Sequence, residues 1–132
     1  MNRKEKLKML KEAAYEVICE EKLPTPKNIR YRSPLNGNMK RMGVCQRTRE
    51  GDYSILINTT IANFVPDPSG KYKNNKTGQR MRRIMGIDIK FEDLLKTMGH
   101  EIAHLKFFNH GTEHKCYTKH IVNSLKQKLA LS

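Results

Sequence analysis

The sequence predicts an α+β fold for a single domain that spans residues 1–132. Apolar residues recur at three- and four-residue steps near both ends of the chain, as in amphipathic helices, whereas segments between them alternate apolar and polar residues, as in strands. The length of 132 residues is enough to bury one core but not two. We therefore expect an N-terminal helix, a small sheet of three to four mainly antiparallel strands, and two later helices.

Residues 3–22 are predicted to form the first helix. Lysine and glutamate side chains occupy the face opposite its apolar side, and Pro24 and Pro26 end it. Because both charge signs are present, we expect this helix to pack on a core rather than bind a membrane. Its apolar side consists of Leu7, Leu10, Ala14, Val17 and Ile18.

Three segments are predicted to be strands, at residues 28–32, 39–46 and 53–58. The residues R-T-R-E-G-D lie between the second and third segments and are predicted to form a hairpin loop. Residues 84–89 are predicted to add a short extra strand. Together these segments predict a small, mainly antiparallel sheet.

Residues 66–83 carry no hydrophobic periodicity and are rich in proline, glycine, asparagine and basic residues. We predict that they form a long basic loop inserted into the domain. Loops of this length tend to be functional or mobile.

Two further helices are predicted, one over residues 91–107 and one from an N-cap at Thr112 to about Leu129. Gly99 lies inside the first of them, where glycine costs about 1 kcal/mol relative to alanine. Close approach of a neighbouring strand or helix would explain this glycine, and so would local tolerance of it. The predicted inward residues are Phe91, Leu94, Leu95, Met98, Ile102 and Leu105 in the first helix, and Cys116, Ile121, Leu125 and Leu129 in the second.

The net charge of the chain is +13, and most of the surplus lies in two segments. Residues 23–49 hold seven basic residues and no acidic one, and residues 66–83 hold six basic residues and one acidic one. Such charge attracts nucleic acid, and it also favours solubility. Tyr31, Tyr53 and Tyr72 lie among these basic residues, where they either stack on single-stranded bases or simply fill sheet and loop surfaces.

The three cysteines are widely spaced and include no C-x-x-C, which excludes a disulfide framework and a cysteine zinc ribbon. The charged N-terminus lacks the apolar region of a secretion signal. No apolar run approaches the ~18 residues that a membrane span needs. We therefore expect a cytoplasmic protein with reduced thiols and no membrane partner.

The segment with the clearest chemistry is H-E-I-A-H, in which His100 and His104 flank Glu101. Residues four apart lie on the same face of a helix, about 6 Å from each other, so the two imidazoles can converge on one zinc ion. Glu101 would lie beside the metal without binding it, where it can take a proton from the water that zinc activates. This pattern predicts the zinc site of a metallopeptidase.

A zinc site that keeps an open position needs a third protein ligand. His110 is our first candidate, since Asn109 and Gly111 permit the turn that would bring it back to the metal. Glu113 is the second candidate and His114 the third. For His114, and for His120 further along, we expect a polar, exposed position on the last helix.

The segment H-E-I-A-H-L-K-F-F-N-H-G-T-E-H resembles the active-site helix and following turn of SprT-like and WLM (YgjP-like) zinc metallopeptidases. The segment M-G-V-C-Q-R-T-R-E-G-D-Y-S-I-L-I-N-T-T-I is similar to the strand pair of that group, and the order of helices and strands also matches. The likeness covers most of the chain. It implies a zincin-like fold, one zinc ion held by His100, His104 and His110, and Glu101 as general base. In minigluzincins, another set of small relatives, the third ligand is a glutamate, and the corresponding residue here would be Glu113.

The resemblance implies a zinc metallopeptidase that cuts proteins or peptides, and the group includes proteases that act on proteins crosslinked to DNA. The basic segments 23–49 and 66–83 fit contact with nucleic acid. The alternative is a basic nucleic-acid-binding module whose zinc site is structural or catalytically silent. A third possibility is a latent protease whose cleft is blocked by the 66–83 loop or by a terminus. An arginine, Tyr117 or His120 could stabilise an oxyanion, and the sequence does not decide among them. It also leaves the oligomeric state open.

Overall fold

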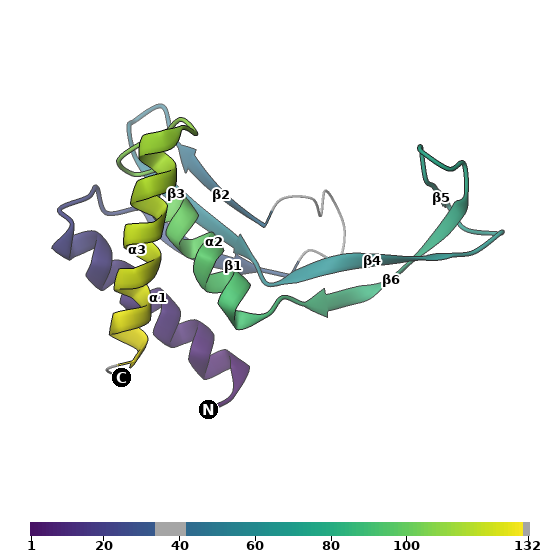
Figure 1. Cartoon of the computed structure of the whole chain (residues 1–132), viewed down its shortest axis with the longest axis horizontal. Helices are drawn as coiled ribbons and strands as arrows, with labels where there is room; N and C mark the ends of the chain where they lie inside the picture. The colour runs from purple at the N-terminus through teal and green to yellow at the C-terminus, as the bar shows by residue number, and fades with distance from the viewer. Residues whose placement is uncertain (34–41, 131–132) are drawn as a thin grey trace.

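A computed structural model of the chain describes residues 1–33 and 42–130 and confirms the α+β fold. Three helices and a three-stranded sheet share one core, and a second three-stranded sheet extends away from them (Figure 1). We call the helices and the first sheet the body, and the second sheet the arm.

The first helix, α1 (Arg3–Glu20), confirms the predicted helix and is two residues shorter. The side chain of Asn2 caps its start by accepting a hydrogen bond from the Glu5 backbone N–H at 2.8 Å. Lys22, with a φ of 55°, turns the chain out of the helix before the two prolines. The buried residues of α1 are Leu10, Ala13, Ala14, Val17 and Ile18.

The first sheet consists of β1 (Asn28–Arg32), β2 (Gly43–Arg47) and β3 (Tyr53–Asn58), in the order β1-β3-β2. Strand β1 runs parallel to β3 and β2 runs antiparallel to it. The predicted hairpin between β2 and β3 is confirmed, and Gly51 supplies the positive φ that its turn requires. The strand predicted at 39–46 begins at Gly43 within the described residues, and positions 39–41 lie outside them.

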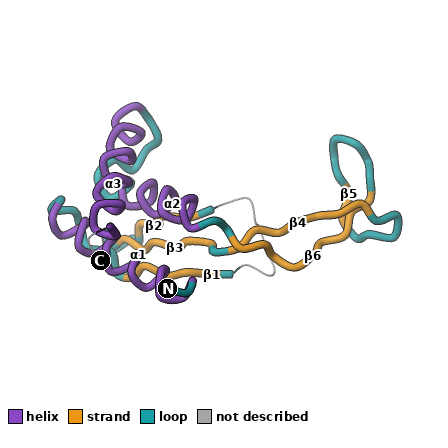
Figure 2. The backbone as a smooth tube through the Cα atoms, turned by 60° about the horizontal axis from the view of Figure 1, so that its bottom comes forward, coloured by secondary structure: helices purple, strands orange, loops and turns teal. Residues whose placement is uncertain are grey.

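The second sheet consists of β4 (Thr60–Pro66), β5 (Tyr72–Lys73) and β6 (Arg80–Asp88), in the order β4-β6-β5. Both pairings are antiparallel. The arm that these strands form points away from the helices, with β5 near its far end (Figures 1 and 2).

The prediction of a continuous loop over residues 66–83 is therefore wrong in part. Both ends of this segment belong to strands, β5 forms within it, and the strand predicted at 84–89 begins as early as Arg80. Strand β4 was not predicted. These strands are stabilised by pairing with each other, and polar sequences such as R-M-R-R show no periodicity that would predict such pairing.

The helices α2 (Phe91–Ala103) and α3 (Thr112–Ala130) cross closely. A Cβ atom at Gly99 would clash with the Val122 side chain of α3, so close approach is the explanation for this glycine that the structure supports. The predicted extension of α2 to residue 107 is wrong, because the helix ends at Ala103 and the chain then turns.

The core lies between the helices and one face of the first sheet, and it contains all the predicted inward residues of α2 except Phe91, which is half-buried. Cys116 of α3 is exposed, so its predicted inward position is wrong. Within residues 1–33 and 42–130, no helix combines the length and apolar character needed to cross a membrane. The sheet contributes Ile29, Ile55 and Ile57 to the core, and the helices contribute mainly Leu10, Val17, Ile18, Leu94, Met98, Ile102, Ile121 and Leu125.

Candidate metal centre

Four histidines meet at the end of α2. His100 lies in the last turn of the helix and His104 is its C-cap residue. His110 follows in the connecting loop, and His114 lies in the first turn of α3. Every pair of these rings has a centroid separation between 4.1 and 5.2 Å. The turn at the end of α2 thus brings together residues that span 15 positions of the sequence.

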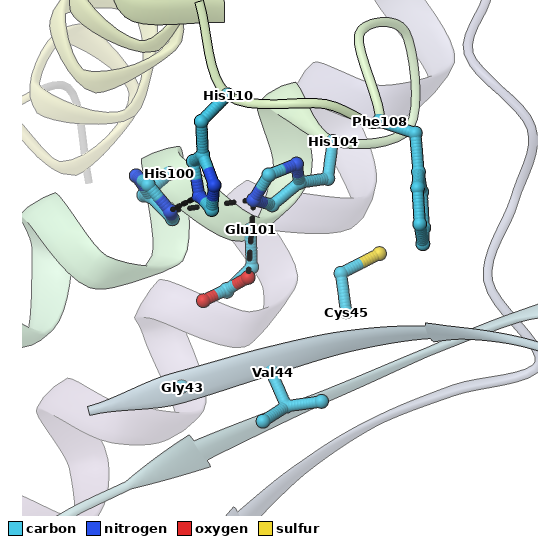
Figure 3. Close-up of a pocket in the computed structure, with 8 residues that line it drawn as sticks. All are labelled: Gly43, Val44, Cys45, His100, Glu101, His104, Phe108 and His110. Atoms are coloured by element: carbon cyan, nitrogen blue, oxygen red, sulfur yellow. Dashed lines mark hydrogen bonds and ion pairs between the residues drawn. The ribbon is translucent and has the colours of Figure 1, made fainter. Parts of the chain in front are cut away.

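Three of the four rings, those of His100, His104 and His114, each place a nitrogen within 4.8 Å of the other two, which is close enough to hold one metal ion. His110 also faces this cluster. The Nε2 atom of His100 lies 3.1 Å from Nε2 of His110 and 3.3 Å from Nε2 of His104 (Figure 3). The structure therefore places both His110 and His114 beside the predicted pair.

His114 is 3% exposed, so the prediction of an exposed position for it is wrong. Its Nε2 atom lies 3.1 Å from the backbone carbonyl oxygen of His100. Because a carbonyl oxygen only accepts hydrogen bonds, Nε2 must carry the proton, and Nδ1 of the neutral ring keeps its lone pair. If His114 binds a metal, it does so through Nδ1.

The same reasoning fixes the tautomer of His104. Its Nδ1 atom lies 3.2 Å from the carbonyl oxygen of Phe107 and must donate to it. The lone pair of Nε2 therefore points toward His100. A ring N–H that donates to a backbone carbonyl is the usual way in which proteins orient a metal-binding histidine.

Burial favours the neutral form of His100, His104 and His114. Burial, followed by the neighbouring rings of His114, His104 and His110, lowers the pKa of His100 to about 4. Burial is also the largest cause that lowers the pKa of His104 and the pKa of His114. Since only the neutral ring offers a lone pair, these shifts favour metal binding at neutral pH.

Glu101 is 4% exposed, and its Oε1 atom lies 3.9 Å from Nε2 of His104. The carboxylate packs against Gly43 of the adjacent strand β2. A Cβ atom at position 43 would lie 2.9 Å from Oε2 of Glu101 and 2.8 Å from Cγ2 of Thr97. The glycine therefore makes room for the carboxylate, which accounts for a residue that weakens strands.

A pocket of about 370 Å³ opens over this carboxylate, between α2 and β2 (Figure 3). Cys45 of β2 lies on its wall, and burial, followed by the charge of Glu101, raises the pKa of that thiol to about 12. The thiol is therefore neutral at physiological pH. The pocket is lined by Gly43, Val44, Cys45, His100, Glu101, His104, Phe108 and His110.

The strand side of this pocket was not predicted as part of the site. Gly43 and Cys45 lie more than 50 positions before the histidines, and only the pairing of β2 with β3 brings them there. A glycine within a predicted strand was the available signal, because it often marks close approach of another group.

The remaining candidates lie elsewhere. Glu113 is exposed, and it is not part of the histidine group that the described residues form. The hydroxyl of Tyr117 donates to Oε1 of Glu21 at 2.9 Å, and Nε2 of His120 lies 2.9 Å from the same oxygen. His120 is exposed as predicted, and neither it nor Tyr117 lines the pocket.

Comparisons of the chain with models of protein families, with curated proteins and with solved structures find no match in any of the three. The likeness to SprT-like metallopeptidases therefore rests on the motifs themselves.

Proposed function

We propose that this protein is a zinc-dependent metallopeptidase in which Glu101 is the general base. The observation that supports this most directly is the position of Glu101, buried beside the histidines and open to a pocket. Burying a carboxylate is costly. A purely structural metal site has no need of such a group between two ligands, whereas hydrolysis needs a proton acceptor there.

The histidine nitrogens suit zinc. Two nitrogens that bind zinc at 2.0–2.1 Å with tetrahedral geometry are about 3.4 Å apart. The Nε2 atom of His100 lies 3.3 Å from Nε2 of His104 and 3.1 Å from Nε2 of His110. His100, His104 and His110 would hold one ion, with His114, which has a nitrogen within 4.8 Å of those of His100 and His104, as the rival third ligand. Zinc supplies a Lewis acid that polarises a carbonyl group and lowers the pKa of water.

The open edge of β2 suits an extended peptide substrate. Among the described strands, β2 pairs only with β3. The backbone N–H of Asn58 donates to the carbonyl of Met42 at 2.8 Å, one residue beyond the register pair Gly43–Ile57. Antiparallel pairing alternates, so the N–H and C=O groups of Gly43 and Cys45 point away from β3. A peptide added as a strand at this edge would lie next to Glu101 and the histidines.

Glu101 would act on such a peptide by taking a proton from the attacking water and donating it to the leaving amine. The raised pKa of Cys45 keeps its thiol from competing as a nucleophile. Gly43 leaves room beside β2 for the carboxylate that carries the proton.

The test is Glu101→Gln, assayed on fluorescently labelled unfolded casein beside zinc analysis of the same samples. We expect a loss of activity of about 10²- to 10⁴-fold, with zinc retained. Glu12→Gln, an exposed carboxylate on α1, is the matched control and should keep full activity. Wild-type protein that holds zinc and cleaves no peptide, or a Glu101→Gln variant as active as wild type, would refute the proposal.

A second candidate function arises because four histidines, and not three, lie together at this site. If His110 and His114 both bind, the ion is held by four side chains and has no open position, as in structural zinc sites. The protein would then be a basic nucleic-acid-binding module with a silent metal centre. Absorption spectra of the cobalt-substituted protein distinguish four protein ligands from three, because an exchangeable position responds to added azide.

A further inference from the structure

The arm is built without a core of its own. Of the described residues, six large apolar side chains are exposed, and four of these lie on the arm: Ile61, Phe64, Tyr72 and Ile87. None of the buried apolar side chains of the described residues comes from β4, β5 or β6. A small sheet with both faces in water is only marginally stable, so a functional reason for keeping it is expected.

The base of the arm is fixed to the body. The guanidinium of Arg3 donates to the carbonyl of Ile89 at 2.8 Å and to the carbonyl of Thr59 at 2.7 Å. These two residues flank the arm, and the N–H of Ile89 also donates to the carbonyl of Thr59 at 3.0 Å. The same arginine lies 3.8 Å from the carboxylate of Asp88. Helix α1 therefore holds both strands where they leave the body.

One face of the arm carries a pair of aromatic rings. Pro66 of β4 and Tyr72 of β5 both pair with Met81 of β6, and Phe64 lies two residues from Pro66, so Phe64, Tyr72 and Met81 share a face. The two rings lie edge to face, with centroids 5.3 Å apart and planes at 72°. Phe64 is 41% exposed and Tyr72 is 46% exposed. The rings form an open corner.

A depression of about 310 Å³ lies at this corner, lined by the two rings together with Lys73, Asn74 and Met81. A flat ring that enters it can stack on one aromatic face while its edge meets the other ring. Because Lys73 on the rim is positively charged, the depression suits a ligand that contains both planar rings and negatively charged groups.

The charge of the arm fits such a ligand. Thr60–Asp88 contains six basic residues and two acidic ones. Both acidic residues are already paired with arginine, Asp67 with Arg82 at 3.3 Å and Asp88 with Arg3. The exposed cations near the tip are Lys71, Lys73, Lys76 and Arg80.

We propose that the arm binds single-stranded nucleic acid, with a base stacked at the Phe64–Tyr72 corner and phosphates held by the lysines and Arg80 at the tip. Ring faces can stack only on bases that are not already paired and stacked in a duplex, which selects a single strand. An acidic protein would use the cations but leave the corner unused. A second copy of the arm would bring like charges together. The proposal does not rest on the peptidase activity.

The test measures fluorescence anisotropy of a labelled oligothymidylate of about 20 nucleotides and of a duplex of the same length, titrated with full-length protein at several salt concentrations. Wild type should bind the single strand more tightly than the duplex. Tyr72→Ala and Phe64→Ala should each weaken binding about 5- to 150-fold, the range for one base–aromatic stack. Ile87→Ala is the matched control, because this side chain is 46% exposed on the same arm but has no aromatic face.

The electrostatic part has its own control. Lys73→Ala should lower the slope of log K against log salt by about 0.7, the value for one phosphate contact on a single strand. Lys119→Ala, an exposed lysine of α3, should leave it unchanged. Glu101→Gln should bind like wild type, which separates this proposal from the peptidase.

Three results would overturn the proposal. The first is the absence of binding to the single strand. The second is equal or tighter binding to the duplex with no effect of Tyr72→Ala. The third is a change of oligomeric state in Tyr72→Ala by light scattering, which would make a second copy the partner of the arm.

Discussion

The histidine cluster and the arm differ in how far their candidate functional side chains are exposed to solvent. At the metal centre, Glu101 and His114 are almost completely buried, and the packed helices and the first sheet set their positions. In the arm, Phe64 and Tyr72 stand in solvent, and the contacts that fix the arm to the body lie at its base. The first region suits chemistry that needs groups held in place, and the second suits a long, adaptable ligand.

The largest expected effect is at the metal ligands. His104→Ala should lose zinc completely, because this ring belongs to the histidine group that could hold a metal and its Nε2 atom lies 3.3 Å from Nε2 of His100. We expect His110→Ala to lose zinc as well, and His114→Ala to retain it with affinity lowered about 10- to 100-fold, as for residues that orient ligands. Elemental analysis after dialysis measures this. Loss of zinc in His114→Ala with full retention in His110→Ala would make His114 the third ligand.

A smaller effect is expected where the strand meets the carboxylate. Gly43→Ala places a Cβ atom 2.9 Å from Oε2 of Glu101, so the carboxylate must shift. A displacement of this kind costs about 100-fold in kcat, while zinc content should stay at the wild-type level. Gly51→Ala, at the hairpin turn, is a control that strains only the backbone. Equal kcat for Gly43→Ala and wild type would show that the position of Glu101 is less constrained than burial implies.

The smallest effect is expected at the base of the arm. Arg3→Ala removes two hydrogen bonds to backbone carbonyls and should lower the free energy of unfolding by about 1–3 kcal/mol. Amide hydrogen exchange should speed up at Ile89 and along β6, and stay unchanged in α2 and α3. Faster exchange at the end of α2 would show that the two regions are coupled.

The two regions also differ in how far the sequence predicts them. Helix geometry alone predicts that His100 and His104, four residues apart, lie on the same face of α2 and meet in one cluster. The burial of His114 depends on how closely α3 crosses α2 at Gly99, a contact between elements that local patterns do not contain. Its predicted exposure was therefore wrong.

In the arm, the failure has a different cause. Residues 80–83, R-M-R-R, become a strand because they pair with neighbouring strands, residues 81–83 with β4 and residues 80–81 with β5. No core face imposes an apolar repeat on these residues, so the periodicity used to predict strands is missing. The predicted strand at 84–89 covers only the second half of β6, which contains Ile84 and Ile87.

The hydrogen bond between Ile89 and Thr59 means that the chain leaves the body and re-enters it at neighbouring points. The 29 residues from Thr60 to Asp88 therefore resemble a domain insertion, because the two points at which they join the body lie side by side. Replacing them with a short turn would preserve the path of the remaining backbone. Conversely, the same junction could accept a foreign hairpin in place of the arm, with the body and its histidine cluster left as they are.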